Sequence, residues 1–206
     1  MKNNLKTGMS TASYICHELT NYLSVMKFQQ EDIEDNIDPK YEEFLSPFFN
    51  TLDYLIITMD FFRNVYSPTH SKNDVLSIIS KISKIKNIKL NGINEIIKIS
   101  QDNPPLEKLY AGIIYIAMKS CRDKSSLSIS IDNYNNPSDI RIIFDDINSF
   151  IKQSIIDALT NNNFDIIEED SYNVFALYMR RLSIELNMSI KINNNNDKLV
   201  INICKQ

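Results

Sequence analysis

The sequence predicts an α+β protein in which an N-terminal two-helix hairpin precedes an α/β sandwich. Two observations predict the hairpin. Apolar residues recur at heptad spacing over residues 12–33 and again over residues 41–66, and a proline-containing turn separates the two runs. A third observation predicts the sandwich, because helical and strand-like patterns alternate from residue 74 to the end of the chain.

The first helix is expected over residues 10–36, with Ser10 or Thr11 as its cap. Its apolar residues follow one another in steps of four and three, which is typical of a helix that packs against another helix. They are Ala12, Cys16, Leu19, Leu23, Met26 and Ile33. His17 comes one residue after Cys16 and is therefore turned about 100° away from this row. We expect its imidazole to face solvent, where a neutral ring nitrogen is a possible phosphoryl acceptor.

The second helix is expected after a turn at residues 37–40, with Pro39 at a first-turn position that needs no N–H donor. Pro47 lies in the first turns of this helix, where proline is able to kink it. The heptad row runs through Tyr41, Leu45, Phe48, Leu52, Leu55, Met59, Phe62 and Tyr66. Further large apolar residues lie off the row, namely Phe44, Phe49, Ile56 and Phe61. Two helices cannot bury this much aromatic surface, so we expect the hairpin to form a four-helix bundle as a homodimer.

A polar, proline-containing stretch at residues 67–72 predicts a domain boundary, with a dimerisation domain at 1–68 and an α/β domain at 69–206. His70 falls in this stretch and is interpreted as an ordinary linker residue. In the second domain, helices are expected at 74–85, 104–121, 147–159 and 171–187. Strands are expected at 87–90, 96–100, 126–132, 140–145, 188–193 and 198–204. The helices should cover one face of a mixed sheet.

Composition excludes several classes of protein. A net charge of −4 argues against binding to nucleic acid or to an anionic membrane surface. Neither a signal peptide nor a membrane span is apparent, and Cys16, Cys121 and Cys204 stand singly, so we expect a reduced, cytoplasmic protein. With only three glycines, the chain cannot build a glycine-rich phosphate loop in the usual way, and ATP binding through such a loop is not expected.

The segment His17-Glu18-Leu19, followed by a polar pair and an apolar residue, resembles the H-box of sensor histidine kinases. In those kinases the phosphoryl-accepting histidine lies on the first helix of a dimerising hairpin, and a second domain binds ATP in a GHKL-type fold. The order of domains in this chain is similar. The usual proline of the H-box is replaced by Tyr22.

The second domain resembles the kinase ATP-binding domain in layout but not in chemistry. Residues 106–119 look like the helix that carries the N-box, yet the position of its magnesium-binding asparagine matches Ile116. Residues 143–149 look like the adenine-binding D-x-G-x-G box, in which Asp145 remains while Ile147 and Ser149 stand where glycines would be. The lid glycines would fall at 174–177, where none is present. The resemblance therefore implies a degenerate ATPase-like domain without ATP-driven autophosphorylation.

A kinase-like dimerisation hairpin joined to a degenerate ATP domain is similar to the ChpT-type bacterial histidine phosphotransferases. This resemblance implies a phosphorelay in which His17 accepts a phosphoryl group from a receiver-domain aspartate and passes it to another. It implies response-regulator receiver domains as partners, including one of a hybrid histidine kinase, with Mg²⁺ held by the receiver and no cofactor on this chain. Glu18 would hydrogen-bond the second ring nitrogen of His17, and Asn21 would shape the site one turn later. The receiver would touch Ser13, Tyr14, Thr20 and Ser24.

Other interpretations stay open from the residues alone. His17 is also compatible with an ordinary surface histidine, Glu18 with a solvated helix charge, and Asn21 with a neutral surface residue. Arg180 and Arg181 are compatible with a solvated helix face or with a contact to an acidic receiver surface. The protein as a whole is compatible with a non-catalytic dimeric adaptor that binds a signalling partner. An active kinase with a divergent nucleotide site would instead bind ATP saturably.

Overall fold

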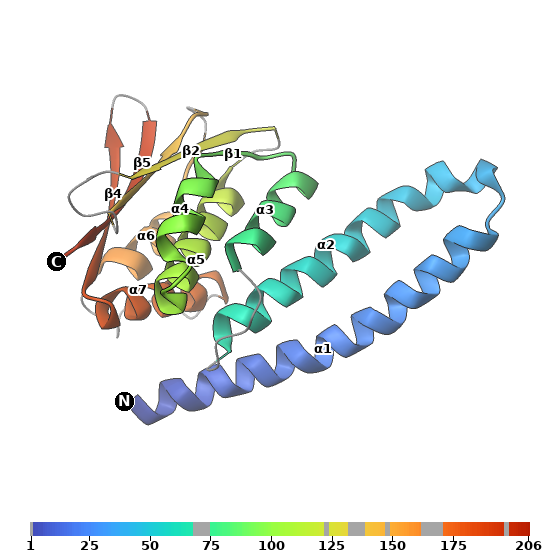
Figure 1. The fold of residues 1–206 in the computed structure, drawn as a ribbon, viewed down its shortest axis with the longest axis horizontal. Helices are drawn as coiled ribbons and strands as arrows, with labels where there is room; N and C mark the ends of the chain where they lie inside the picture. Colours follow the sequence, from blue (N-terminus) through green and yellow to red (C-terminus); the bar gives the residue numbers. More distant parts are fainter. Residues whose placement is uncertain are drawn as a thin grey trace. The chain divides into compact units, whose positions relative to one another are not determined.

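The computed structural model describes residues 2–67, 75–121, 124–131, 139–146, 149–161, 171–195 and 198–206. The chain divides into two compact units, residues 1–85 and 86–206 (Figure 1). The expected domain boundary at residues 68 and 69 lies outside the described residues, as does His70. The first unit extends past this point and includes a third helix.

The first unit is built on a long helical hairpin. Helix α1 spans Lys2–Asn36, and α2 spans Glu42–Tyr66. The end of α1 falls where the sequence predicted it, but its start lies eight residues earlier than expected, at Lys2 and not at Ser10. Ser10 and Thr11 therefore lie inside the helix and not at its start, because residues 2–9 continue the helical backbone without a proline or a break.

The turn of the hairpin is closed by Asp38, whose side-chain oxygen accepts a hydrogen bond from the Lys40 backbone N–H at 3.1 Å. Lys40 also forms an ion pair with this carboxylate, and the two contacts hold the pKa of Asp38 below its usual range. Pro39 begins a short 3-10 helix, η1 (Pro39–Tyr41), in which its missing N–H leaves no bond unmade. Pro47 lies within α2, as the sequence predicted.

The predicted apolar row of α1 divides into two stripes. Cys16, with 8% of its surface exposed, and Gln30, with 2%, are buried, whereas Leu19, Met26 and Ile33 stay more than 40% exposed. The reason is geometric, since a heptad row on a straight helix covers a sector too broad for one neighbouring helix to bury. The sequence row skipped Gln30 because it is polar, yet its position belongs to the buried stripe.

Helix α3 (Val75–Ile85) packs against α2 within the first unit. One face of α2 supplies fully buried Phe61 and Val65, both of which lie off the predicted heptad row. Helix α3 is strongly amphipathic, and Leu76, Ile79 and Ile82 on its apolar face are completely buried. Helix α3 therefore covers part of the aromatic surface on α2 that the two helices of the hairpin could not bury.

The second unit contains a five-stranded mixed sheet with strand order β1-β2-β3-β5-β4. The strands are β1 (Lys89–Asn91), β2 (Ser126–Ile131), β3 (Ile140–Phe144), β4 (Met188–Asn195) and β5 (Lys198–Lys205). Strand β1 pairs with β2 in parallel, and the other neighbours are antiparallel. Side chains alternate along β2 and β3, with Leu127, Ile129 and Ile142 buried on the face that the helices cover.

The helices of this unit are α4 (Ile93–Ser100), α5 (Pro104–Ser120), α6 (Gln153–Thr160) and α7 (Ser171–Glu185). In Figure 1 they gather on one side of the sheet, which confirms the predicted α/β sandwich. Asn103 caps α5 by accepting a hydrogen bond from the Leu106 N–H, and Pro104 and Pro105 open the helix.

The predicted strand at 96–100 is wrong, because these residues form α4. Ile93, Ile96 and Ser100 are buried at the spacing of one helix face, and the short window at 96–100 hid that period. Gly92 precedes the helix with φ of +85°, and a Cβ at this position would lie 1.9 Å from the Ile129 carbonyl oxygen of β2. Only glycine satisfies both conditions.

Smaller differences concern element ends. The helix predicted from residue 147 begins at Gln153, and residues 147–148 lie outside the described residues. Strand β4 continues to Asn195, two residues beyond the predicted end, because Asn194 and Asn195 pair with Leu199 and Lys198. Asparagine in this hairpin therefore lengthens the strand where a loop was expected.

Candidate functional site

His17 lies in the middle of α1, and its side chain is exposed. Cys16, one residue earlier, is buried on the face toward the hairpin interior, so the 100° step per residue carries the imidazole away from that face as the sequence predicted. Residues three or four positions away share the imidazole's face of the helix. They are Ser13, Tyr14, Thr20 and Asn21.

The two hydroxyl residues after His17 bond to their own helix. The Thr20 hydroxyl donates to the Cys16 carbonyl at 2.7 Å, and the Ser24 hydroxyl donates to the Thr20 carbonyl at 2.8 Å. Each hydroxyl hydrogen is thus used within the helix, and only the oxygen lone pairs remain for an incoming partner. Tyr14, on the same face of α1, has 64% of its surface exposed.

Glu18 and Asn21 flank the imidazole on α1. Glu18 is half-buried and Asn21 is exposed. No hydrogen bond joins Glu18 to the His17 ring in the part of the chain that the structure describes, which fits adjacent helical residues that diverge by 100°. To fix the His17 tautomer, the Glu18 side chain would have to adopt another rotamer on phosphorylation or partner binding.

Two exposed apolar residues further along the His17 side of α1 were not among the predicted site residues. Val25 is 58% exposed and Phe28 is 72% exposed. Val25 follows Asn21 by four residues and Phe28 by seven, so both lie on the side of α1 that carries Asn21 and Tyr14. Both residues lie off the predicted apolar row of α1, so the heptad spacing alone does not indicate them.

The Cys16 thiol, next to His17 in the sequence, has low nucleophilic reactivity. Burial raises the pKa of Cys16, and the positive charge of Arg63 offsets this rise only in part. Arg63 itself pairs with Asp60 one turn earlier on α2. Since a thiol is nucleophilic only as the thiolate, His17 is the available nucleophile at this point of α1.

In the second unit, the aspartate that matches the adenine-binding box is hydrogen-bonded to serine side chains of the same unit. The Asp145 carboxylate accepts hydrogen bonds from the Ser126 hydroxyl at 2.6 Å and from the Ser128 hydroxyl at 3.0 Å. Its neighbour Asp146 accepts a hydrogen bond from Ser125. Asp145 thus ties the end of β3 to β2 and offers fewer lone pairs to a ligand.

Helices α5 and α7 pack directly against each other where the kinase-like boxes would lie. Ile116, at the position of the magnesium-binding asparagine, is 6% exposed. Tyr115 of α5 and Phe175 of α7 stack edge to face with ring centroids 5.9 Å apart. A Cβ on Gly112 would lie 1.9 Å from the Met179 sulfur, so this glycine permits close approach of the two helices. The segment at 174–177, where a lid would be, is helical.

Arg180 and Arg181 divide between the two roles considered for them. Arg180 is buried, and its guanidinium donates to the Leu159 carbonyl at 2.7 Å, which joins α7 to the end of α6. Arg181 is more exposed and pairs loosely with Glu185 along the same helix. The interpretation of Arg180 as part of a solvated helix face is therefore wrong, because its guanidinium is buried and donates a hydrogen bond to a backbone carbonyl.

Neither a metal centre nor a membrane segment is found within the described ranges. No group of three or more His, Cys, Asp or Glu residues there is arranged to hold a metal ion. No described helix combines the length and the apolar character that crossing a bilayer requires.

No protein-family model and no curated protein matches this chain. Among solved structures, a bacterial phosphotransferase superposes with a TM-score of 0.59 over 98% of this chain and 94% of its own, at 10% sequence identity. The chain has the fold of that phosphotransferase. A histidine kinase domain of the Erythrobacter litoralis EL346 blue-light activated kinase also matches, over 98% of this chain and 91% of its own, with a TM-score of 0.37 and 10% identity. The first match confirms the predicted α+β fold, in which a helical hairpin precedes an α/β unit.

Proposed function

We propose that this protein is a histidine phosphotransferase of a two-component phosphorelay. Its imidazole at His17 would accept a phosphoryl group from the aspartate of one receiver domain and pass it to the aspartate of another. The observation that carries the proposal is an exposed histidine on the long first helix of a hairpin, flanked by Tyr14 and Asn21. The whole-chain likeness to a bacterial phosphotransferase supports it. Because such receivers are cytoplasmic domains, the proposal includes a cytoplasmic location for this protein.

The chemical step needs little from the protein beyond placement. A neutral His17 ring nitrogen attacks phosphorus in line, and the bond from phosphorus to the receiver's carboxylate oxygen breaks. The carboxylate leaves with the electron pair. The other ring nitrogen keeps its proton, so the phosphorylated ring carries a positive charge. That charge makes the imidazole a good leaving group when a second receiver aspartate attacks.

The same proposal includes a homodimer formed through the hairpin. Exposed apolar residues form one stripe on α1, comprising Ile15, Leu19, Tyr22, Met26 and Ile33. A matching stripe runs along η1 and α2, comprising Tyr41, Phe44, Phe48 and Leu55. Counting 100° per residue from buried Cys16 and buried Leu52 places both stripes on the same side of the hairpin. A second copy that covers this side completes a four-helix bundle.

This dimer leaves the nucleophile accessible. Leu19 follows His17 by two residues, so the two side chains leave α1 about 200° apart. Leu19 belongs to the apolar stripe, and His17 therefore faces the opposite side. In the assembled bundle each copy presents its own His17, with Tyr14 beside it and with Val25 and Phe28 two to three turns further along the same side of α1 for a receiver to contact.

We further propose that the α/β unit does not drive autophosphorylation with ATP. Three features of the described residues support this: the occupied Asp145 carboxylate, the buried Ile116, and the packing of α7 against α5. Binding of radiolabelled ATP to the full-length protein tests this point. Saturable binding would favour the kinase alternative.

The central experiment is phosphotransfer without ATP. A panel of receiver domains from the same organism is phosphorylated with labelled phosphate and incubated with wild-type protein, with His17→Ala and with His70→Ala. His70 is the only other histidine of the chain and serves as the matched control. We expect acid-labile, base-stable label on wild type and on His70→Ala, and none on His17→Ala. No label from any donor on a folded dimer would favour the adaptor alternative.

A further inference from the structure

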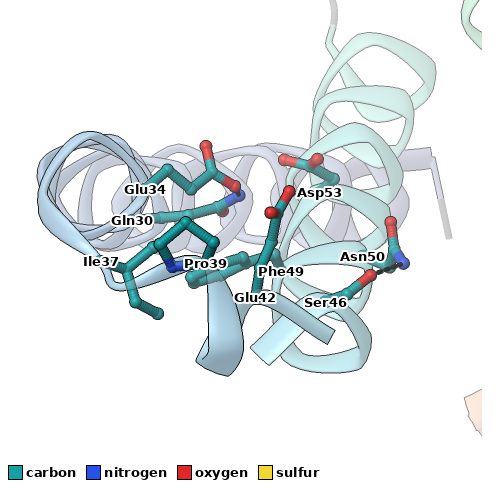
Figure 2. Close-up of a pocket in the computed structure, with 9 residues that line it drawn as sticks. All are labelled: Gln30, Glu34, Ile37, Pro39, Glu42, Ser46, Phe49, Asn50 and Asp53. Carbon is teal, nitrogen blue, oxygen red and sulfur yellow. Dashed lines mark hydrogen bonds between the residues drawn. The ribbon is translucent and has the colours of Figure 1, made fainter. Parts of the chain in front are cut away.

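The register of the hairpin places Arg63 of α2 opposite His17 of α1. At the turn end, residues of both helices line one pocket and face each other across it (Figure 2). Next to this pocket, the Lys27 ammonium of α1 forms an ion pair with Asp53 of α2 at 2.8 Å. The two helices are antiparallel, so a step back along α1 corresponds to an equal step forward along α2. Ten residues before Lys27 is His17, and ten residues after Asp53 is Arg63.

Electrostatic contacts at this level of the hairpin agree with the register. Burial raises the pKa of Cys16, the neighbour of His17, and the positive charge of Arg63 lowers it. Burial also raises the pKa of Tyr66 to about 12, with a smaller contribution from Cys16. Tyr66 follows Arg63 by one helical turn. The last turn of α2 therefore lies against the segment of α1 that carries the proposed nucleophile.

Arg63 is held on the side of the hairpin that His17 faces. Its guanidinium donates through Nη2 to the Asp60 carboxylate, and the two groups form an ion pair. Asp60 follows Phe48 by twelve residues and Phe44 by sixteen, so its side chain leaves α2 about 120–160° away from the apolar stripe. His17 also points away from that stripe. The ion pair and the imidazole thus share the side that the proposed dimer leaves open.

Arg63 has the charge and the donors that a phosphoryl group needs. Its side chain is 35% exposed, so an incoming anion is able to reach it. A guanidinium has five N–H donors in a planar fork, and in the described part of the chain Asp60 accepts from one of its nitrogens. Arg63 is also the only Lys or Arg in residues 7–26 and 42–66. A phosphoryl group carries up to two negative charges, and this is the cation of these segments that could meet them.

We propose that Arg63 binds the phosphoryl group that His17 carries, an inference that rests on the proposed phosphotransfer. The guanidinium moves from the Asp60 carboxylate to two non-bridging phosphoryl oxygens, a bidentate arrangement that suits its planar fork. No covalent bond changes in this exchange, and the Asp60 carboxylate becomes hydrated. Because the charge of the group in transit is spread over the same oxygens, Arg63 stabilises transfer both onto His17 and away from it.

Chemical phosphorylation separates this proposal from the relay itself. Potassium phosphoramidate phosphorylates accessible histidines without a receiver, and a His70→Ala background leaves His17 as the only histidine. A pH titration of the ³¹P resonance then gives the pKa of the phosphoryl group. A nearby cation favours the dianion, so we expect this pKa to be at least about 0.5 lower in the folded protein than in urea. Arg63→Gln should remove most of the difference, and Arg63→Lys should keep part of it.

Lys27→Gln is the matched control, because it also removes one cation from an ion pair with a carboxylate of this hairpin. Lys27 lies ten residues from His17, about 15 Å along α1, which exceeds the Debye length of about 8 Å at physiological salt. The phosphoryl pKa of this variant should stay within about 0.1 of wild type. Equal pKa values in the folded and the urea-unfolded wild type would overturn the proposal. An equal rise in Lys27→Gln and Arg63→Gln would do the same.

The relay gives a second readout that fails separately. With a receiver that labels His17, Arg63→Gln should slow transfer at least about tenfold, and an unchanged rate would contradict the role of Arg63 in transfer. If no receiver labels the wild type, the proposed relay fails while the ³¹P titration still decides whether Arg63 binds the phosphoryl group. If phosphoramidate leaves the folded protein unmodified, His17 carries no group for Arg63 to bind and both proposals fail.

Discussion

Replacing Phe44 with serine tests the proposed homodimer at its most exposed aromatic residue. Phe44 is 82% exposed in the single chain. An aromatic side chain buries roughly 150–250 Å² when fully covered, so a second copy would remove about 160 Å² of Phe44 from water. At about 25 cal/mol per Å² this corresponds to an upper limit of about 4 kcal/mol for each copy. The symmetric dimer loses the contribution twice.

Part of that energy is offset by incomplete coverage and by the ordering of side chains on association. A buried aromatic residue at the centre of an interface still costs about 2 kcal/mol or more when truncated. We therefore expect Phe44→Ser to raise the dimer dissociation constant by about a thousandfold, which corresponds to about 4 kcal/mol for the two copies together. Sedimentation equilibrium across a concentration series measures this constant directly.

Phe28→Ser is the matched control for this experiment. Phe28 is 72% exposed, nearly as much as Phe44, but it lies on the side of α1 away from the apolar stripe. Its replacement should leave the dimer constant unchanged within about twofold. The reasoning is refuted if the wild-type protein sediments as a monomer, or if both serine variants weaken the dimer equally.

Three further predictions concern stability. Gly92→Ala should lower the free energy of unfolding by about 3 kcal/mol or more, because it adds a Cβ at φ of +85° and 1.9 Å from the Ile129 carbonyl oxygen; a urea titration with an unchanged midpoint contradicts this. Gly8→Ala is the opposite case, since a Cβ there meets nothing within 4 Å inside α1, and it should raise stability by about 0.5–1 kcal/mol in the same titration. Burial raises the pKa of Cys121 from 9.0 to about 11. Between these values the unfolded chain loses a proton that the folded chain keeps, so this thiol makes stability fall as the pH rises from about 9 to about 11. Cys121→Ser should flatten that part of the stability profile, and an unaltered slope would show that other groups cause it.

The hairpin was predictable because its signals are long and local. Heptad spacing over many turns and a Pro39 turn need no knowledge of the rest of the chain, and the end of α1 at Asn36 followed from them. The exposure of His17 followed from one buried neighbour and the helical period. The start of α1 was missed because capping residues such as Ser10 also occur inside helices, where nothing in their identity marks them.

The remaining errors come from contacts that no local window contains. The segment 96–100 reads as a strand until Ile93 is included and the helical period appears. Gln30 is polar and so was left out of the buried row, although the geometry of α1 puts it there. Arg180 was assigned to solvent because charge usually lies there, and its bond to the Leu159 carbonyl depends on where α6 ends. The pocket at the hairpin turn is lined by residues from both α1 and α2, so no local window of the sequence contains it.

The burial of Cys16 has a consequence for chemical fidelity. A sulfur nucleophile and a nitrogen nucleophile are neighbours on one helix, yet only one of them competes for an electrophile. With its thiol held protonated against the hairpin interior, Cys16 is shielded from oxidants and alkylating agents that would otherwise block the adjoining imidazole with a bulky adduct. The same helical step that exposes His17 therefore keeps the thiol away from it, and oxidants should leave the proposed phosphotransfer at this residue intact.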